Sequence, residues 1–205
     1  MTKGNLGELV SRQRAPSDIS AVLLAGGKSR RMGEDKATLL FRGKPLWRIQ
    51  LQLLRKLEPA EIFVSARTDP AWRPDDVQFV ADDPPSRGPL SGLAASLNRM
   101  RGTHLLALAI DMPFMSESYF RSLFLQIEPG RGVLPKIDNR AEPLVAIYPR
   151  EAGIDFRNAL AGADFSLQTL TSRLVRAGKL RPIRVSDEAR EFFLNLNQPA
   201  DVQSG

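Results

Sequence analysis

Residues 19–36 of the chain read ISAVLLAGGKSRRMGEDK, an apolar run that ends in two consecutive glycines and continues into a basic segment. A short, fully apolar run of this kind is typical of a buried strand in a parallel sheet. Glycine after such a strand lets the backbone approach a ligand closely, and successive free N–H groups in the turn can bind an anion. The stretch therefore predicts a buried strand that leads into a phosphate-binding loop.

Basic side chains follow the two glycines and strengthen the prediction of a phosphate site. Arg30, Arg31 and Lys36 can form charge-assisted hydrogen bonds to a polyphosphate. The spacing matches neither the Walker P-loop nor the G-x-G-x-x-G fingerprint of dinucleotide-binding folds. Together, Gly26, Gly27 and these cations indicate a phosphate-binding turn of another type.

Outward from this strand, apolar runs alternate with segments of helical spacing. Strands that alternate with helices imply a mostly parallel central sheet with helices on both faces, so the predicted fold class is α/β with three layers. Ligands of such folds bind outside the carboxyl ends of the strands, near the point where the strand order reverses. Strands are expected at residues 19–25, 61–66, 78–81, 104–110, 133–134, 144–148 and 180–185, and helices at residues 45–57, 90–100, 116–127, 150–160 and 166–177.

Length and charge set the broad class of the protein. The 205 residues favour a single domain, expected over residues 18–205, after a polar N-terminal tail at residues 1–17. Lys and Arg number 29 against 23 Asp and Glu, and the resulting charge of +6 favours anionic partners.

Composition also argues against several kinds of protein. Without cysteine the chain has no disulfide, zinc–thiolate site or cysteine nucleophile, which suits a reducing cytoplasm. We expect no membrane association, because the start lacks a signal peptide and no apolar run is long enough to cross a bilayer. An aromatic content of 7% without an RNA-binding signature argues against a nucleic-acid partner. The sole histidine, His104, begins an apolar run and is interpreted as structural.

Two of the apolar runs end in aspartate. Residues 78–81 lead to Asp82, and residues 104–110 lead to Asp111. A carboxylate at the end of a parallel strand faces the ligand crevice, and carboxylates are ligands that Mg²⁺ prefers together with phosphate oxygens and water. Asp111 is therefore the predicted metal ligand. For Asp82, contact with the ribose or base is as plausible as contact with metal, and Gly88, between the two aspartates, is expected to line the nucleotide pocket.

Short segments spread over the chain together resemble the molybdenum cofactor guanylyltransferase family, within the nucleotidyltransferases that have a Rossmann-like core. The resemblance runs from about residue 19 to residue 201, and the ordered set carries it rather than any single piece. The segments are LAGG at 24–27, RMG at 31–33, DK at 35–36, GKPL at 43–46, GPLSGL at 88–93, DMPF at 111–114, EPLVAIY at 142–148 and NLNQP at 195–199.

The resemblance implies a role for residues that match the family's motifs. Ser65 departs from the pattern, because relatives often carry asparagine there, so one contact with the nucleoside is expected to be lost or bridged by water. The implied roles are backbone contact with the nucleotide for Leu24, Ala25 and Gly26, triphosphate binding and catalysis for Arg31 and Lys36, nucleoside binding for Asp82, Mg²⁺ binding and catalysis for Asp111, and a place on the acceptor side for Asn197.

The reaction that the resemblance implies is transfer of GMP from GTP to the terminal phosphate of molybdopterin or molybdenum-molybdopterin, with Mg²⁺ as cofactor and release of pyrophosphate. Cofactor-insertion proteins or a molybdoenzyme are the further partners that it suggests. One alternative is a cytidylyltransferase for the same cofactor, whose members tend to carry Ala-Ala-Gly at residues 25–27. Others are a sugar-phosphate or isoprenoid-precursor nucleotidyltransferase, and a binding protein without catalysis, against which the intact Asp111 argues.

Overall fold

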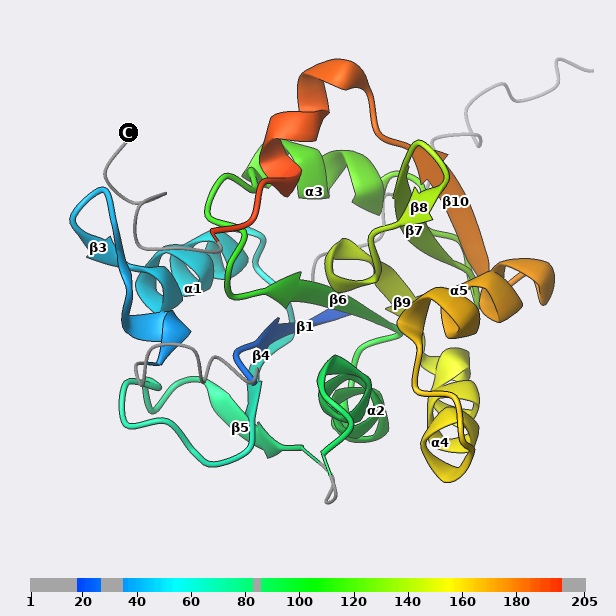
Figure 1. The fold of residues 1–205 in the computed structure, drawn as a ribbon, viewed down its shortest axis with the longest axis horizontal. Helices are drawn as coiled ribbons and strands as arrows, with labels where there is room; N and C mark the ends of the chain where they lie inside the picture. Colours follow the sequence, from blue (N-terminus) through cyan, green and yellow to red (C-terminus); the bar gives the residue numbers. More distant parts are fainter. Residues whose placement is uncertain (1–17, 27–34, 83–85, 197–205) are drawn as a thin grey trace, which may run out of the picture.

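The computed structural model describes residues 18–26, 35–82 and 86–196, and Figure 1 shows their arrangement. The tail predicted at residues 1–17 lies outside these residues. A central sheet of eight strands carries helices on both faces, which confirms the predicted three-layer α/β class. Within the described part of the chain, no helix is long and apolar enough to cross a membrane.

The central sheet is mostly parallel, as predicted. Its strands, in chain order, are β1 (Ile19–Leu24), β4 (Glu61–Ala66), β5 (Gln78–Ala81), β6 (His104–Ala109), β7 (Gly132–Ile137), β8 (Arg140–Ala141), β9 (Ile147–Pro149) and β10 (Leu180–Arg184). They lie in the order β10-β7-β9-β6-β1-β4-β5, with β8 paired to β7. β9 is antiparallel to both β6 and β7, so β7 runs in the same direction as β6. The carboxyl ends of β1, β4, β5, β6 and β7 therefore lie at one edge of the sheet, called here the carboxyl edge.

The helices divide between the two faces of the sheet (Figure 1). They are α1 (Leu46–Lys56), α2 (Pro89–Arg99), α3 (Glu117–Phe124), α4 (Gly153–Ala161) and α5 (Leu167–Arg176). Successive side chains of a strand point to opposite faces. Ala21 and Leu23 of β1 accordingly join the apolar core beneath α1 and α3, whereas Val22 and Leu24 join the core beneath α2, α4 and α5. Burial on both faces explains why the strand reads as a continuous apolar run.

Polar residues fix where several helices begin. Pro45 directly precedes α1, where its missing N–H costs no helical hydrogen bond. Ser116 caps α3, as predicted, because its hydroxyl accepts from the N–H of Tyr119 at 3.2 Å. Ser166 caps α5 in the same way through Thr169, at 3.3 Å.

One predicted strand is partly wrong. Residues 144–148 were expected to be extended, but the chain there first forms the 3-10 turn η3 (Pro143–Val145) and only then enters β9. The turn closes because the N–H of Val145 donates to the carbonyl of Glu142 at 3.1 Å. Pro143 favours this turn, since proline has no N–H for a sheet ladder. The first part of the segment that the sequence predicts as strand is therefore a turn at the carboxyl edge, and Ile147 and Tyr148 belong to β9.

Several short elements were not predicted, among them a hairpin and a 3-10 segment. The hairpin of β2 (Leu40–Phe41) and β3 (Lys44–Pro45) turns through Arg42 and Gly43, whose φ angles of 51° and 73° are both positive. This is the geometry of a two-residue turn that matches the twist of the strands. The 3-10 segment η5 (Asp187–Phe193) follows β10 and packs its phenylalanines against Tyr119 of α3.

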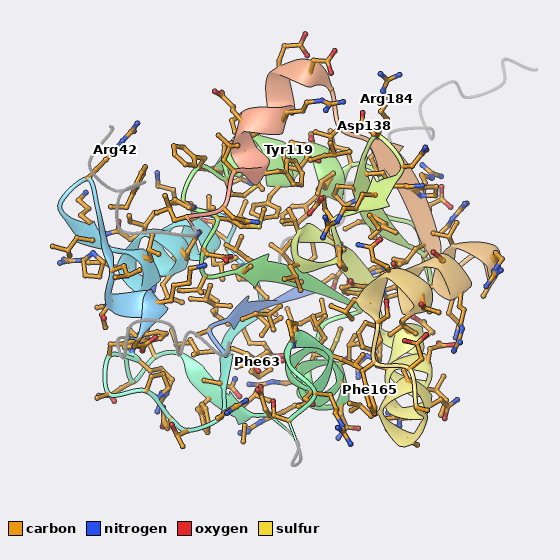
Figure 2. The ribbon with its side chains drawn as sticks, in the orientation of Figure 1. Arg42, Phe63, Tyr119, Asp138, Phe165 and Arg184 are labelled. Atoms are coloured by element: carbon orange, nitrogen blue, oxygen red, sulfur yellow. The ribbon has the colours of Figure 1, made fainter. Side chains whose placement is uncertain are left out.

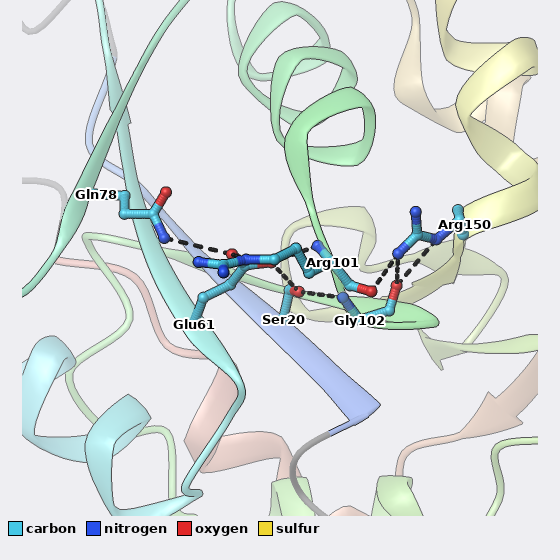
Figure 3. A network of polar contacts seen from close by, with 6 residues as sticks. All are labelled: Ser20, Glu61, Gln78, Arg101, Gly102 and Arg150. Carbon is cyan, nitrogen blue, oxygen red and sulfur yellow. Dashed lines mark hydrogen bonds and ion pairs between the residues drawn. The ribbon is translucent and has the colours of Figure 1, made fainter.

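The opposite edge of the sheet is held by a polar network (Figure 3). Glu61, 8% exposed, accepts from the Ser20 hydroxyl at 2.8 Å and from the backbone N–H and guanidinium of Arg101 at 2.5 and 3.1 Å. Arg150 continues the network through the carbonyl of Gly102. These contacts tie the amino ends of β1 and β4 to the loop before β6. His104, interpreted as structural, begins β6 at this edge and is 1% exposed.

Candidate active site

The strand order reverses at β1. From β1 the chain crosses through α1 to β4 and β5 on one side, and it returns through α2 to β6 on the other side. A reversal of this kind leaves a crevice outside the carboxyl ends of the strands, where ligands of α/β folds bind. Leu24 is the last residue of β1, so the glycine turn begins at the switch point.

Hydrogen bonds hold the start of this turn between the two neighbouring strands. The N–H groups of Ala25 and Gly26 both donate to the carbonyl of Ser65, at 2.9 and 3.1 Å. On the other side, the N–H of Ile110 donates to the carbonyl of Leu24 at 3.1 Å. Gly27 and Arg31, which were predicted to bind phosphate, lie outside the described residues.

Asp82 lies directly after β5 and is held by two serines. Its Oδ1 accepts from the hydroxyl of Ser65 at 2.8 Å, and its Oδ2 accepts from the hydroxyl of Ser86 at 3.1 Å. The aspartate is 8% exposed and Ser65 is 1% exposed. With both oxygens engaged by hydroxyl groups, Asp82 suits a wall of the nucleoside pocket better than a metal site. Ser65, which the sequence pattern put in doubt, orients this carboxylate.

Two glycines leave room for the Ser65–Asp82 pair. A Cβ at Gly92 of α2 would stand 2.3 Å from Ser65 Oγ and 3.2 Å from Asp82 Oδ1. A Cβ at Gly26 would stand 3.0 Å from Asp82 Oδ2. Gly92 therefore permits the close packing of α2 that the sequence predicts. Gly88, at φ 67° and ψ −143°, makes the turn into the same helix.

Lys36 and Asp111 meet across the carboxyl edge of the sheet. Lys36 begins the 3-10 turn η2 (Lys36–Thr38), and Asp111 stands just beyond β6. The Lys36 ammonium donates to Asp111 Oδ2 at 2.8 Å, with side chains 21% and 25% exposed. Two residues that lie 75 positions apart in the sequence are thus brought together, as the predicted catalytic set requires.

Lys36 is positioned by an aspartate and a tryptophan that sequence reasoning did not include in the site. Asp35 caps η2 through the N–H of Ala37 at 3.0 Å, and its other oxygen accepts from the indole N–H of Trp72 at 2.7 Å. Trp72 stacks on Trp47 of α1, with ring centroids 5.6 Å apart. The two stacked rings pack α1 against the loop between β4 and β5. The sequence signal that could have revealed this support is Asp35, the acidic residue directly before Lys36.

The C-terminal part of the chain also reaches Asp111. The N–H of Leu196 donates to the carbonyl of Asp111 at 2.9 Å. This bond places the end of the described chain at the end of β6. Asn197, predicted on the acceptor side, is the next residue and lies outside the described part.

The donors present fit a magnesium ion that is shared with a substrate. Among residues 18–26, 35–82 and 86–196, no cluster of three or more His, Asp or Glu side chains could enclose a metal. Asp111 is a partly exposed carboxylate at the crevice, whereas both oxygens of Asp82 are already hydrogen-bonded. Mg²⁺ is commonly held by one or two carboxylates plus substrate phosphates and water. This arrangement suits nucleotide-dependent binding through Asp111.

Comparisons with known proteins agree with this geometry. Residues 21–177 match the family described as the MobA-like NTP transferase domain. A probable molybdenum cofactor guanylyltransferase from Opitutus terrae is 34% identical over 188 residues, covering 90% of this chain and 93% of that protein. A molybdenum cofactor guanylyltransferase from Syntrophotalea carbinolica is 31% identical, covering 90% and 89%. The crystal structure of molybdopterin-guanine dinucleotide biosynthesis protein A from Archaeoglobus fulgidus superposes with a TM-score of 0.73 at 25% identity, covering 90% and 95%.

Proposed function

The chain belongs to the MobA-like NTP transferase family, and from this premise we propose that it transfers GMP from GTP to the terminal phosphate of molybdopterin. The products are molybdopterin guanine dinucleotide and pyrophosphate. The observation that carries the proposal is the contact of Lys36 with Asp111 at the switch point, beside the glycine turn that follows β1. The similarity to the two guanylyltransferases named above covers about nine-tenths of each of those proteins, and this supports the choice of reaction.

The reaction is an in-line displacement at the α-phosphorus of GTP. An oxygen of the acceptor phosphate forms the new bond to the α-phosphorus, and the bond from that phosphorus to the oxygen bridging to the β-phosphate breaks. The electron pair leaves with pyrophosphate. The acceptor phosphate is already ionised, so the protein needs no general base. Positioning and charge stabilisation therefore supply the catalysis.

Lys36 and Arg31 supply positive charge for the triphosphate in this proposal. The Lys36 ammonium lies at the crevice, 2.8 Å from Asp111, and can exchange that contact for a phosphate oxygen. Leu24, Ala25, Gly26 and Gly27 would bring backbone groups to the nucleotide. Gly27 and Arg31 enter the proposal on the sequence motif alone.

Asp111 would hold Mg²⁺, which when bound neutralises charge on the triphosphate and on the leaving pyrophosphate. Asp82 and Gly88 would line the nucleoside side of the pocket, and Asn197 the acceptor side. We further propose that the protein works in the cytoplasm, without nucleic acid, and passes its product to a cofactor-insertion protein or a molybdoenzyme.

The test is pyrophosphate release with each of the four common NTPs and Mg²⁺, with and without molybdopterin. We expect release with GTP only, and only when molybdopterin is present. Preference for CTP would replace the guanylyl transfer by a cytidylyl transfer at the same site. No release with any NTP from folded protein would overturn the proposal.

A further inference from the structure

A second cavity opens at the carboxyl edge, beyond the site described above. It has a volume of about 620 Å³ and is lined by Ile137, Asp138, Asn139, Arg140, Glu142 and Gln168. These residues come from the end of β7, the turn into β8, the start of η3 and the helix α5. None of them has a role in the phosphate chemistry.

The walls of this cavity are fixed by hydrogen bonds. Gln168 fastens β8 from α5: its amide N–H donates to the carbonyl of Ala141 at 2.8 Å, and its amide oxygen accepts from the N–H of Ala141 at 3.3 Å. The N–H of Glu142 donates to the carbonyl of Pro135 at 2.9 Å. On the next turn, the buried hydroxyl of Tyr148 donates to the carbonyl of Pro143 at 2.6 Å. The backbone on both sides of Glu142 is therefore held in place.

One carboxyl in the cavity wall and one buried hydroxyl on α3 have no hydrogen-bond partner among the described residues. The Glu142 carboxyl is half-buried, and no hydrogen bond from the described residues reaches it. Desolvation by this burial raises its pKa, although the charge of Arg140 works in the other direction. The hydroxyl of Tyr119 is buried and lacks a hydrogen-bond partner among the described residues. Burial, and then the charge of Glu142, raises the pKa of Tyr119 to about 12.

Tyr119 projects from α3, while Asp138 stands at the β7–β8 turn; Figure 2 labels both in the upper part of the view. Asp138 is paired with Arg190 of η5, with a shortest contact of 2.5 Å. The same element packs phenylalanines on Tyr119. The cavity and the buried hydroxyl thus belong to one neighbourhood at this end of the sheet.

The cavity lies within reach of the phosphate site. β7 is separated from β6 by β9 alone, and two strand spacings amount to about 10 Å. Where β9 does not extend to the carboxyl edge, η3 fills the place between β6 and β7. Asp111 therefore stands on one side of this turn and Glu142 at its start. When the acceptor phosphate lies at Asp111, an attached ring system as long as a pyranopterin reaches Glu142.

We propose that this cavity binds the pterin ring of the acceptor, with the Glu142 carboxylate accepting hydrogen bonds from the 2-amino group and the adjacent ring N–H. The inference rests on the proposed function. A 2-amino-4-oxopyrimidine ring presents these two donors side by side, and a carboxylate presents two acceptors at matching separation. Glu142 thereby selects the acceptor by its heterocycle, whereas Lys36 and Asp111 act on its phosphate.

The first measurement compares the binding of free pterin with that of lumazine, in which a carbonyl replaces the 2-amino group. Both are tested by competition against molybdopterin on the full chain. We expect pterin to bind wild-type protein about tenfold more tightly than lumazine, because the carbonyl oxygen faces the carboxylate without a donor. Equal affinity, or no binding of either compound, overturns the proposal.

The second measurement uses Glu142→Gln, with Glu151→Gln as the control because Glu151 is exposed and lies at the opposite edge of the sheet. In Glu142→Gln we expect KM for molybdopterin to rise about 10- to 100-fold with KM for GTP unchanged, and the preference for pterin to disappear. An unchanged KM and an unchanged preference contradict the role of Glu142. If wild-type protein makes no product from GTP and molybdopterin, the proposed function fails instead, whereas the comparison of pterin with lumazine needs no turnover.

Discussion

In the proposed reaction, Asp111 and Lys36 are the two charged residues that act on the triphosphate and its metal. Their ion pair is only about a quarter exposed, and a charge contact in such a setting is stronger than one in open water. In the proposed reaction, both residues would face the charge that develops during transfer to the α-phosphorus. Fixed charges of this kind act on the transition state without having to reorganise.

Replacing Asp111 by Asn tests the metal role directly. The amide has nearly the same shape, so we expect kcat for pyrophosphate release to fall about 10²- to 10³-fold while the thermal midpoint of unfolding stays close to that of wild type. The matched control is Asp76→Asn, which removes an exposed carboxylate paired with Arg55. If Asp111→Asn and wild type have comparable activity, Asp111 does not hold the metal. The protein then either binds nucleotide without catalysis or holds the metal through another residue.

Ser65→Ala tests the arrangement that holds Asp82. The change removes a buried donor and leaves Asp82 Oδ1 without the hydroxyl that lies 2.8 Å away. A buried acceptor left in this way costs about 1–3 kcal/mol in the free energy of unfolding. We expect KM for GTP to rise as Asp82 loses its orientation, with kcat much less affected. If the variant has a normal KM for GTP but a lower free energy of unfolding, the Ser65–Asp82 pair has only a structural role.

The residue scale also shows where sequence reasoning stops. Asp82 and Asp111 could be found because each ends an apolar run, and the ends of parallel strands share one edge. The role of Ser65 could not be predicted from the sequence, because it is a hydrogen bond to a residue 17 positions away. The sequence pattern treated serine as the loss of a contact with the nucleoside, whereas in the fold Ser65 donates to the carboxylate of Asp82.

Among the elements, the loop between β4 and β5 controls the turn that carries Lys36. Trp72 from this loop donates to Asp35, and Asp35 in turn caps η2. A loop that lies outside the strand ends thus holds the aspartate that caps the turn beginning with Lys36.

Trp72→Phe separates the hydrogen bond from the ring stack. Phenylalanine keeps an aromatic ring against Trp47 but has no N–H for Asp35. We expect kcat to fall about two- to tenfold with little change in the unfolding midpoint, since one hydrogen bond is worth about 0.5–1.5 kcal/mol. The control is Trp47→Phe, which keeps the donor and should retain activity. Equal kcat in both variants and in wild type would remove Trp72 from the positioning of Lys36.

The strands were predicted correctly where the apolar pattern is strong, and they were missed where a single turn determines the backbone conformation. The strands β1, β4, β5 and β6 were expected within a residue or two of their bounds, because each reads as a short apolar run. Of these, β1, β4 and β6 are buried along nearly their whole length. The bend at η3 was missed, since residues 144–148 are as apolar as a strand and only the bond from Val145 to Glu142 makes them turn. The β2–β3 hairpin was missed because its strands are only two residues long.

In the molecule as a whole, the two edges of the sheet have different tasks. The carboxyl edge gathers the charged groups of the site, whereas the amino edge gathers the network around Glu61. That carboxyl is deeply buried, which by itself raises its pKa, but the hydrogen bonds from Arg101 and Ser20 together outweigh this and lower the pKa below its ordinary 4.5. The charged form is therefore the one that the fold stabilises.

The stability of the protein should depend on pH through this group. Because the pKa of Glu61 is lower in the folded state, its contribution is fully present above pH 4.5 and is lost as pH falls through the folded pKa. We expect Glu61→Gln to lower the free energy of unfolding by about 1–3 kcal/mol at neutral pH and by progressively less in acid. Glu117→Gln, which breaks an exposed pair with Arg121, should cost much less at every pH. A deficit in Glu61→Gln that does not shrink in acid would contradict this assignment.

The bond between Leu196 and Asp111 has a consequence for synthesis of the protein. The glycine turn is made early in translation and Asp111 near the middle, but the residue that closes over the end of β6 is added 85 positions after Asp111. A ribosome-bound chain thus carries the glycine turn and Asp111 long before Leu196 is added. Transcripts interrupted after α5 would yield a protein with most of its sheet and both charged partners, yet without the segment that completes the end of β6.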